Sequence, residues 1–146
     1  DNISKIHSCR LVNAKMDPID YVQIDEEFGV QYEFEIYEDG HIPIPNIHLK
    51  TRKEEHVFIS AEKQDDSFFK IGKYNCIVWV PKDLLNNGEY SIDVGLSSMT
   101  PYVSHFMVQK ALSFEVIEDI SKRIEGHTHK IAGVIRPKLN WKIEKL

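Results

Sequence analysis

Residues 71–96 read IGKYNCIVWVPKDLLNNGEYSIDVGL and contain two predicted strands joined by an arch. The first, Tyr74–Val80, is rich in β-branched and aromatic residues and ends at Pro81, which lacks the N–H that a strand ladder needs. The second, Tyr90–Leu96, is apolar at every second residue, as expected for a strand with one buried face. The arch between them carries two leucines that require burial, which favours a crossing between two sheets over a tight hairpin. This stretch therefore predicts a β-sandwich.

The other strand candidates fit the same architecture. Turn residues recur every 8–12 positions, and seven or eight short strands with that spacing are typical of an immunoglobulin-like, antiparallel Greek-key sandwich. We expect residues 13–27 to be a solvated loop and residues 41–46 to be extended and unpaired, because of Pro43 and Pro45. One predicted sheet contains Ile3–Val12, Phe28–Tyr37 and Tyr74–Val80, and the other contains Ile47–Thr51, Val57–Ala61, Tyr90–Leu96 and His105–Val116.

Length and composition indicate one domain. The chain has 146 residues, of which 42% are hydrophobic, so it can bury one sizeable core. We expect the sandwich to occupy residues 1–117, a polar hinge residues 118–130 and an apolar tail residues 131–146. No run approaches the roughly 18 apolar residues of a membrane span, and no signal peptide is evident, so we expect a soluble domain. Because the chain starts at Asp1 instead of Met, we expect it to be a piece of a longer protein.

Charge and cysteine content exclude several partners. A net charge of −5 argues against nucleic acid or an anionic membrane as the main partner. Two cysteines, Cys9 and Cys76, are too few for a disulfide framework, and we expect free thiols in a reducing compartment. A bridge between them would require Cα atoms within about 7 Å.

No motif in the chain indicates catalysis or a cofactor. His127 and His129 are spaced as two metal ligands would be, but scattered histidines are more often surface residues, so we expect no metal. Ser97-Ser98, His105 and Asp93 supply the residue types of a hydrolase triad without the local sequence that accompanies one. The nucleotide-binding motif G-x-x-x-x-G-K-[ST] is also absent, so this piece is not expected to be an ATPase or any other enzyme.

The arch and the tail together resemble a known family. Residues 74–90, with Pro81, the two leucines and the Gly88-x-Tyr90 step, and the ending GVIRPKLNW of residues 133–141 are similar to the C-terminal domain of Wzt-type ABC transporter ATPase subunits. Those subunits export O-antigen polysaccharides. The resemblance implies a cytoplasmic, non-catalytic sandwich that binds the finished glycan and dimerises by exchanging its last strand. It also implies that the missing part of the chain contacts a membrane transporter subunit.

The residues themselves suggest where a glycan would bind. In Lys73–Val80 the wholly apolar face should point inward, which leaves Trp79 outward. An outward tryptophan is unusual, and aromatic faces with nearby amides and acids suit sugars. Alternatively, Trp79 belongs to the core or is covered by the exchanged tail. The candidate contacts on this sheet are Trp79, Tyr37, Glu35, Asn75 and Gln31. The other sheet offers Arg52 and Asp93, near His48, Lys50 and Ser91, as a more charged surface suited to an anionic or phosphorylated sugar.

The tail is the candidate dimer contact. It contains apolar residues beyond a polar hinge long enough to reach a neighbouring protomer, and exchange keeps the same contacts at little cost. The alternative is packing against an edge strand of the same protomer. The residues expected to exchange are Ile131, Val134, Ile135, Leu139 and Trp141. A second function class also remains: a structural or adhesion-type sandwich that binds a protein through a contiguous apolar patch.

Overall fold

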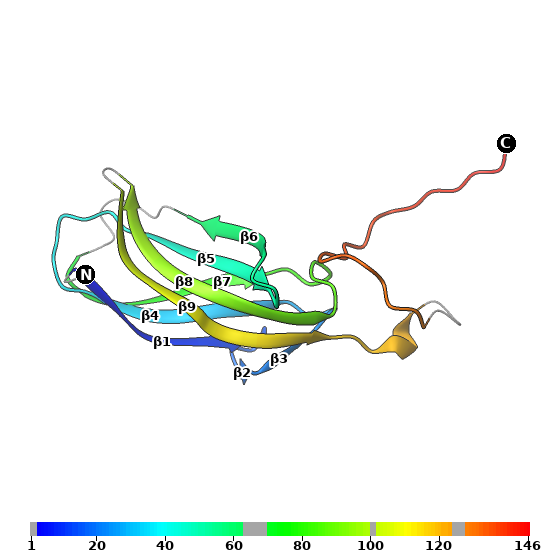
Figure 1. The fold of residues 1–146 in the computed structure, drawn as a ribbon, viewed down its shortest axis with the longest axis horizontal. Coiled ribbons are helices and arrows are strands. Elements are labelled where there is room, and N and C mark those ends of the chain that lie inside the picture. Colours follow the sequence, from blue (N-terminus) through cyan, green and yellow to red (C-terminus); the bar gives the residue numbers. More distant parts are fainter. Residues whose placement is uncertain (1–2, 63–69, 100–101, 124–127) are drawn as a thin grey trace.

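A computed structural model describes residues 3–62, 70–99, 102–123 and 128–146 of the chain. It is a sandwich of two sheets that face each other, with the C-terminal segment extending away from one end (Figure 1). The two sheets confirm the predicted all-β sandwich. Among the described residues, no helix is long and apolar enough to cross a membrane.

The predicted division of the strands between the sheets is also confirmed. The four-stranded sheet has the order β2-β1-β4-β7 and the five-stranded sheet the order β3-β9-β8-β5-β6. The first sheet consists of β2 (Pro18–Ile19), β1 (Ser4–Val12), β4 (Phe28–Ile36) and β7 (Gly72–Val80). The second consists of β3 (Tyr21–Gln23), β9 (Tyr102–Ile117), β8 (Gly88–Met99), β5 (Ile44–Thr51) and β6 (His56–Ala61).

Two sequence expectations about loops are wrong. Residues 13–27 contain the short strands β2 and β3, which lie in different sheets, and β3 pairs parallel to β9, so the sandwich is not wholly antiparallel. Strand β5 starts at Ile44 and includes Pro45, which pairs with Leu96 of β8. The proline is tolerated because it lies at the end of the β5–β6 ladder, where its carbonyl accepts from the Glu62 N–H at 3.4 Å and its missing N–H costs no bond within the strand β6.

The core lies between β4 of one sheet and β8 of the other. Alternate residues of β4, including Tyr32 and Phe34, are buried against Val94 and Leu96 of β8. The Tyr32 hydroxyl donates a hydrogen bond across the core to the Gly95 carbonyl at 3.1 Å. Each sheet therefore presents one face to the core and the alternate residues to the outside.

The two cysteines are free thiols, as expected. Cys9 of β1 and Cys76 of β7 both lie opposite Tyr32 of the intervening strand β4. Strands in a sheet are about 4.8 Å apart, so the two Cα atoms are separated by about 10 Å, which is too far for a disulfide. Burial raises the pKa of the Cys9 thiol to about 11.

The predicted tail divides into two parts. Residues 131–136 lie along the arch between β7 and β8, where Ile135 makes an isolated antiparallel bridge with Leu85. Asn86 fixes this part: its backbone N–H donates to the Val134 carbonyl, and its side-chain amide donates to the carbonyls of Ile131 and Gly133. Residues 137–146 then extend away from the sandwich (Figure 1).

A buried acid ties the predicted hinge to this tail segment. The side chain of Glu118 is 8% exposed and binds both Arg123, across the 3₁₀ turn Ile120–Lys122, and Arg136 of the tail. Hydrogen bonds from Arg123 and then Arg136 lower the pKa of Glu118 to about 2. The hinge is therefore anchored at both ends, although Ile124–His127 lie outside the described residues.

This anchor predicts acid sensitivity. The folded-state pKa of Glu118 is below its unfolded value, so its contribution to stability is present above about pH 4.5 and is lost as the pH falls toward 2. We expect Glu118→Gln to lower the free energy of unfolding at pH 7 by about 1–3 kcal/mol and to reduce its decline in acid. Urea unfolding across this pH range measures both effects. Glu115→Gln is the control, and equal curves for the two variants would contradict the anchor.

Candidate functional site

The outer face of the four-stranded sheet carries an exposed tryptophan. Trp79 lies on β7 with its inward neighbours in the core, and the residue is 39% exposed, so the predicted outward direction is confirmed. It pairs across β4 with Gly29, which in turn pairs with Val12 of β1. A Cβ at Gly29 would lie 3.1 Å from Cζ3 of Trp79 and 2.9 Å from Cγ2 of Val12. The indole therefore approaches the backbone of the glycine closely, while part of the residue stays exposed to solvent.

A network of amides lies next to the tryptophan. Gln31 is two residues from Gly29 on β4, which is roughly 7 Å along the strand. Its side-chain oxygen accepts from Arg10 Nε at 2.7 Å, and its nitrogen donates to Asn75 Oδ1 at 2.9 Å. These bonds orient Arg10 and Asn75 and leave their terminal N–H groups without a protein partner among the described residues. Exposed donors in fixed positions beside a ring are suited to binding hydroxyl groups.

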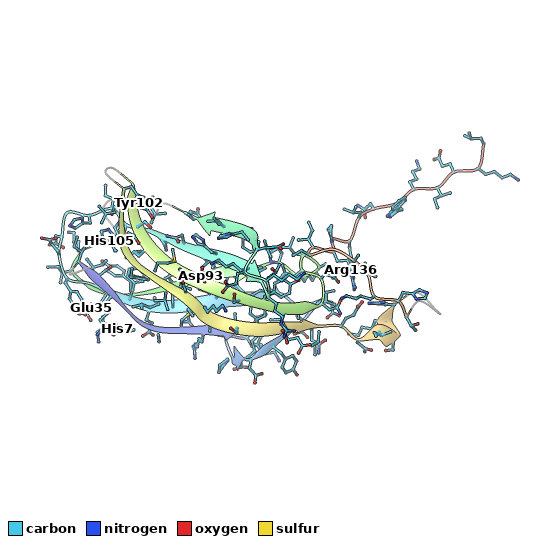
Figure 2. The ribbon with its side chains drawn as sticks, in the orientation of Figure 1. His7, Glu35, Asp93, Tyr102, His105 and Arg136 are labelled. Atoms are coloured by element: carbon cyan, nitrogen blue, oxygen red, sulfur yellow. The ribbon has the colours of Figure 1, made fainter. Side chains whose placement is uncertain are left out.

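The remaining candidates on this sheet lie farther away. Glu35 contacts His7 at 3.0 Å, and Figure 2 shows both side chains at the end of the sandwich opposite Arg136. Tyr37 follows the end of β4 and is 44% exposed. It is eight residues from Gly29, or roughly 26 Å along an extended strand. Trp79 and Tyr37 therefore belong to one face without forming one sugar-sized site.

On the other sheet, Asp93 has a structural role. Its neighbours Ile92 and Val94 belong to the core, so Asp93 lies on the outer side of β8, yet it is only 3% exposed. Its carboxylate contacts Lys50 Nζ at 2.7 Å and accepts from the backbone N–H of Lys110 at 2.9 Å, where β9 bulges and Lys110 takes a positive φ. Burial acts to raise the pKa of Asp93, but these partners hold it below its usual value. The expectation of an exposed Asp93 surface is wrong, because the bulge covers it.

Arg52 does not join Asp93. It follows the end of β5, its side chain is 81% exposed, and it pairs with Glu89 at 3.2 Å. It lines the edge of a pocket of about 400 Å³ on the outer face of the five-stranded sheet.

The residue types of a hydrolase triad are not assembled. Ser98 Oγ and His105 Nε2 lie 2.6 Å apart, and His105 is 1% exposed. Burial, followed by the nearby His41, lowers the pKa of His105. The acid of the supposed triad, Asp93, is instead bound by Lys50 and the β9 bulge. The pair is therefore a buried polar contact between β8 and β9.

The described parts of the chain hold no group of three or more His, Cys, Asp or Glu residues able to bind a metal ion. His127, half of the histidine pair noted in the sequence, lies outside the described residues. His48 and His56 form a pair at 3.1 Å on β5 and β6, and burial followed by His56 lowers the pKa of His48.

Sequence reasoning missed two contributors to the tryptophan face. Arg10 belongs to β1, whose alternation is broken by a bulge at His7, so the alternation could not predict which way the Arg10 side chain points. Gly29 lies in the interior of β4, and glycine within a strand often marks the close approach of another group. That signal was present in the sequence.

Comparison with known proteins agrees with this fold. The crystal structure of the C-terminal domain of Wzt matches with a TM-score of 0.77 and 16% identity, covering 97% of this chain and 84% of that one. At this identity the likeness shows the fold alone. No curated protein matches the sequence. The family model of the Wzt C-terminal domain matches residues 2–135. The chain therefore belongs to the Wzt C-terminal domain family.

Proposed function

We propose that this domain binds an O-antigen-like polysaccharide without catalysing a reaction, as part of an ABC transporter that exports it. Family membership supports the transporter context, and the exposed Trp79 against Gly29 is the observation that supports sugar binding. The proposed site is the outer face of the four-stranded sheet. In the parent protein the domain would be cytoplasmic and held near the membrane through the transporter.

The physical basis of binding is stacking plus directed hydrogen bonds. The C–H face of a sugar ring packs on an indole, while Arg10, Gln31 and Asn75 bind hydroxyl groups beside it. Covering about 100 Å² of aromatic surface contributes at most about 2.5 kcal/mol before association costs. We therefore expect dissociation constants on the order of micromolar to millimolar.

The length of the face suits a polymer. From Trp79 to Tyr37, outward polar residues follow β4 and its neighbours in successive rows, with Gln31, then Glu33 beside Asn75, then Glu35 beside Lys73. A polysaccharide lying along β4 would contact several rows, so that weak contacts add along one chain. A single sugar would not reach both rings.

We further propose that the domain forms a homodimer through residues 137–146. This arm bears apolar residues at alternate positions, as in a strand, and they are highly exposed: Leu139 at 69%, Trp141 at 86% and Ile143 at 91%. A row of exposed apolar side chains marks a protein contact. A second copy of the chain is the occupant that the family resemblance implies. Ile131, Val134 and Ile135 instead lie with the docked segment of the same chain, so the exchanged part would begin at Pro137.

The tryptophan face predicts the outcome of two substitutions. Trp79→Ala and Tyr37→Ala should each weaken binding of the host's O-antigen polysaccharide by about ten-fold, because each removes one stacking surface. Isothermal titration calorimetry measures the affinity, and far-UV circular dichroism checks the fold. Tyr102→Ala is the matched control, since Tyr102 is an exposed aromatic on the other sheet. Wild-type affinity in both test variants would refute this site.

The arm predicts a change in mass. Truncation after Arg136 removes the exposed residues and keeps the segment docked on Asn86, so it should convert a dimer into a folded monomer by light scattering. The full-length double variant Leu139→Ser and Trp141→Ser should behave in the same way. If both proteins keep the mass of the unaltered chain, the arm is not the dimer contact.

A further inference from the structure

The middle strand of the five-stranded sheet has an unusual outer side. The inward residues of β8, such as Ile92, belong to the core, so the alternate residues Ser91, Asp93, Gly95 and Ser97 point outward. All four are buried, and their side chains are short. Longer side chains of β5 and β9 flank them. The centre of the outer face is therefore polar and covered by its neighbours: the β9 bulge covers Asp93, and the side chains of Asn46 and Met107 lie close to Gly95.

Ser91 carries an unpaired hydroxyl on this outer side. It is 6% exposed, and its Oγ has no hydrogen-bond partner among the described residues. It lies between Lys50 of β5 and Ser113 of β9 in the pairing register. Lys50 does not satisfy it, because the ammonium group binds Asp93 at 2.7 Å. Buried hydroxyls without a partner are rare in folded proteins, and each calls for an explanation, of which a bound water, ion or ligand is one.

Ser91 is one of the residues that line an open pocket. Its volume is about 400 Å³, within the range of small-molecule sites. A second pocket of about 490 Å³ adjoins it, sharing Thr51, Arg52, Glu89 and Tyr90, and extends to the docked tail segment 130–134. The lining of the first pocket includes Arg52, Glu89, Ser91, Lys110, Ser113 and Glu115. Two aromatic residues of the core, Tyr90 and Phe114, also line it, but both are buried, so the pocket offers no exposed aromatic ring.

The charges around the pocket disfavour an anion. Each cation already has an acidic partner: Lys50 with Asp93, Arg52 with Glu89, and Lys110 with Glu54. Glu115 adds a further negative charge to the wall. The sequence had suggested an anionic or phosphorylated sugar for this sheet, but these pairings leave no surplus positive charge. The exposed pairs Arg52–Glu89 and Lys110–Glu54 are weak and can exchange partners with hydroxyl groups.

We infer that this Ser91 pocket is a second sugar site, which takes one neutral, hydroxyl-rich sugar residue. The inference rests on the proposed function, since it assumes that the domain binds glycans. The two sites are separate, because the outer faces of the two sheets point in opposite directions (Figure 1). The Trp79 face would hold a stretch of the polymer by stacking. The Ser91 pocket would hold a single residue by hydrogen bonds.

The test uses the full chain and simple neutral probes. Methyl glycosides of mannose, galactose and N-acetylglucosamine are added at increasing concentration, and backbone amide shifts are followed by NMR. We expect at least one of them to shift the resonances of Ser91, Ser113 and Glu89. A uronic acid and a hexose phosphate, added in the same way, should shift these resonances less. The inference would be overturned if the neutral sugars left these pocket resonances unchanged, or if the charged sugars shifted them more strongly.

Two variants separate a ligand site from an ordinary buried serine. Ser91→Ala should keep or raise the melting temperature, because the lost hydroxyl has no protein partner, and should weaken the neutral sugar by about ten-fold. Ser113 is exposed on β9, so the larger side chain of Ser113→Tyr would fill the pocket and should abolish the sugar-induced shifts of the pocket resonances. Persistence of these shifts in both variants would contradict the pocket.

The Ser91 pocket and the Trp79 face can be tested independently of each other. In Trp79→Ala the neutral sugars should still shift the pocket resonances, while binding of the polysaccharide weakens. If these pocket shifts disappear in Trp79→Ala, the two surfaces form one continuous site and the claim of a second site is overturned. Wild-type polysaccharide affinity in Trp79→Ala, with the pocket shifts intact, would count against the proposed Trp79 site and leave the Ser91 pocket standing.

Discussion

The packing of β4 against β8 determines which side chains this protein presents to its surroundings. Tyr32 and Phe34 from one sheet meet Val94 and Leu96 from the other, and the Tyr32 hydroxyl joins the sheets through the Gly95 carbonyl. Because strand side chains alternate, burying these residues commits every second neighbour to the outside. A shift of one residue in β7 would exchange Trp79 for Val78 on the outer face. The candidate binding surfaces are thus a consequence of the core.

The end of the sandwich near the arch imposes a second constraint. Asn86 and the ion pairs of Glu118 hold residues 131–136 against the arch, so the direction in which residues 137–146 leave is set by the sandwich. The exposed arm therefore begins at Pro137, after the docked segment, and not directly after the polar hinge as the sequence had predicted. An arm with a fixed starting direction loses less conformational freedom on docking than one leaving a long flexible hinge. The docked segment thereby favours the contact that the arm is proposed to make.

Much of the fold and part of the candidate site could be predicted from the sequence, for physical reasons that differ between regions. Tyr74–Val80 alternates without interruption, so the outward direction of Trp79 followed directly from the strand period. Burial of Asp93 was not predictable, because its partner Lys110 reaches it only through a bulge that alternation cannot reveal. The strands β2 and β3 are too short to show a period. The separation of Tyr37 from Trp79 depends on the register between β4 and β7, which the arch alone does not specify.

The central claim is that the polysaccharide stacks on Trp79, and the indole N–H resonance of this residue tests it most directly. The chain has two tryptophans, so a Trp141→Phe variant assigns the remaining indole signal to Trp79. Titration of that variant with the host's O-antigen polysaccharide should shift the indole signal progressively and to saturation, together with the side-chain amides of Gln31 and Asn75. A polysaccharide that binds while these three signals stay unchanged would contradict the account.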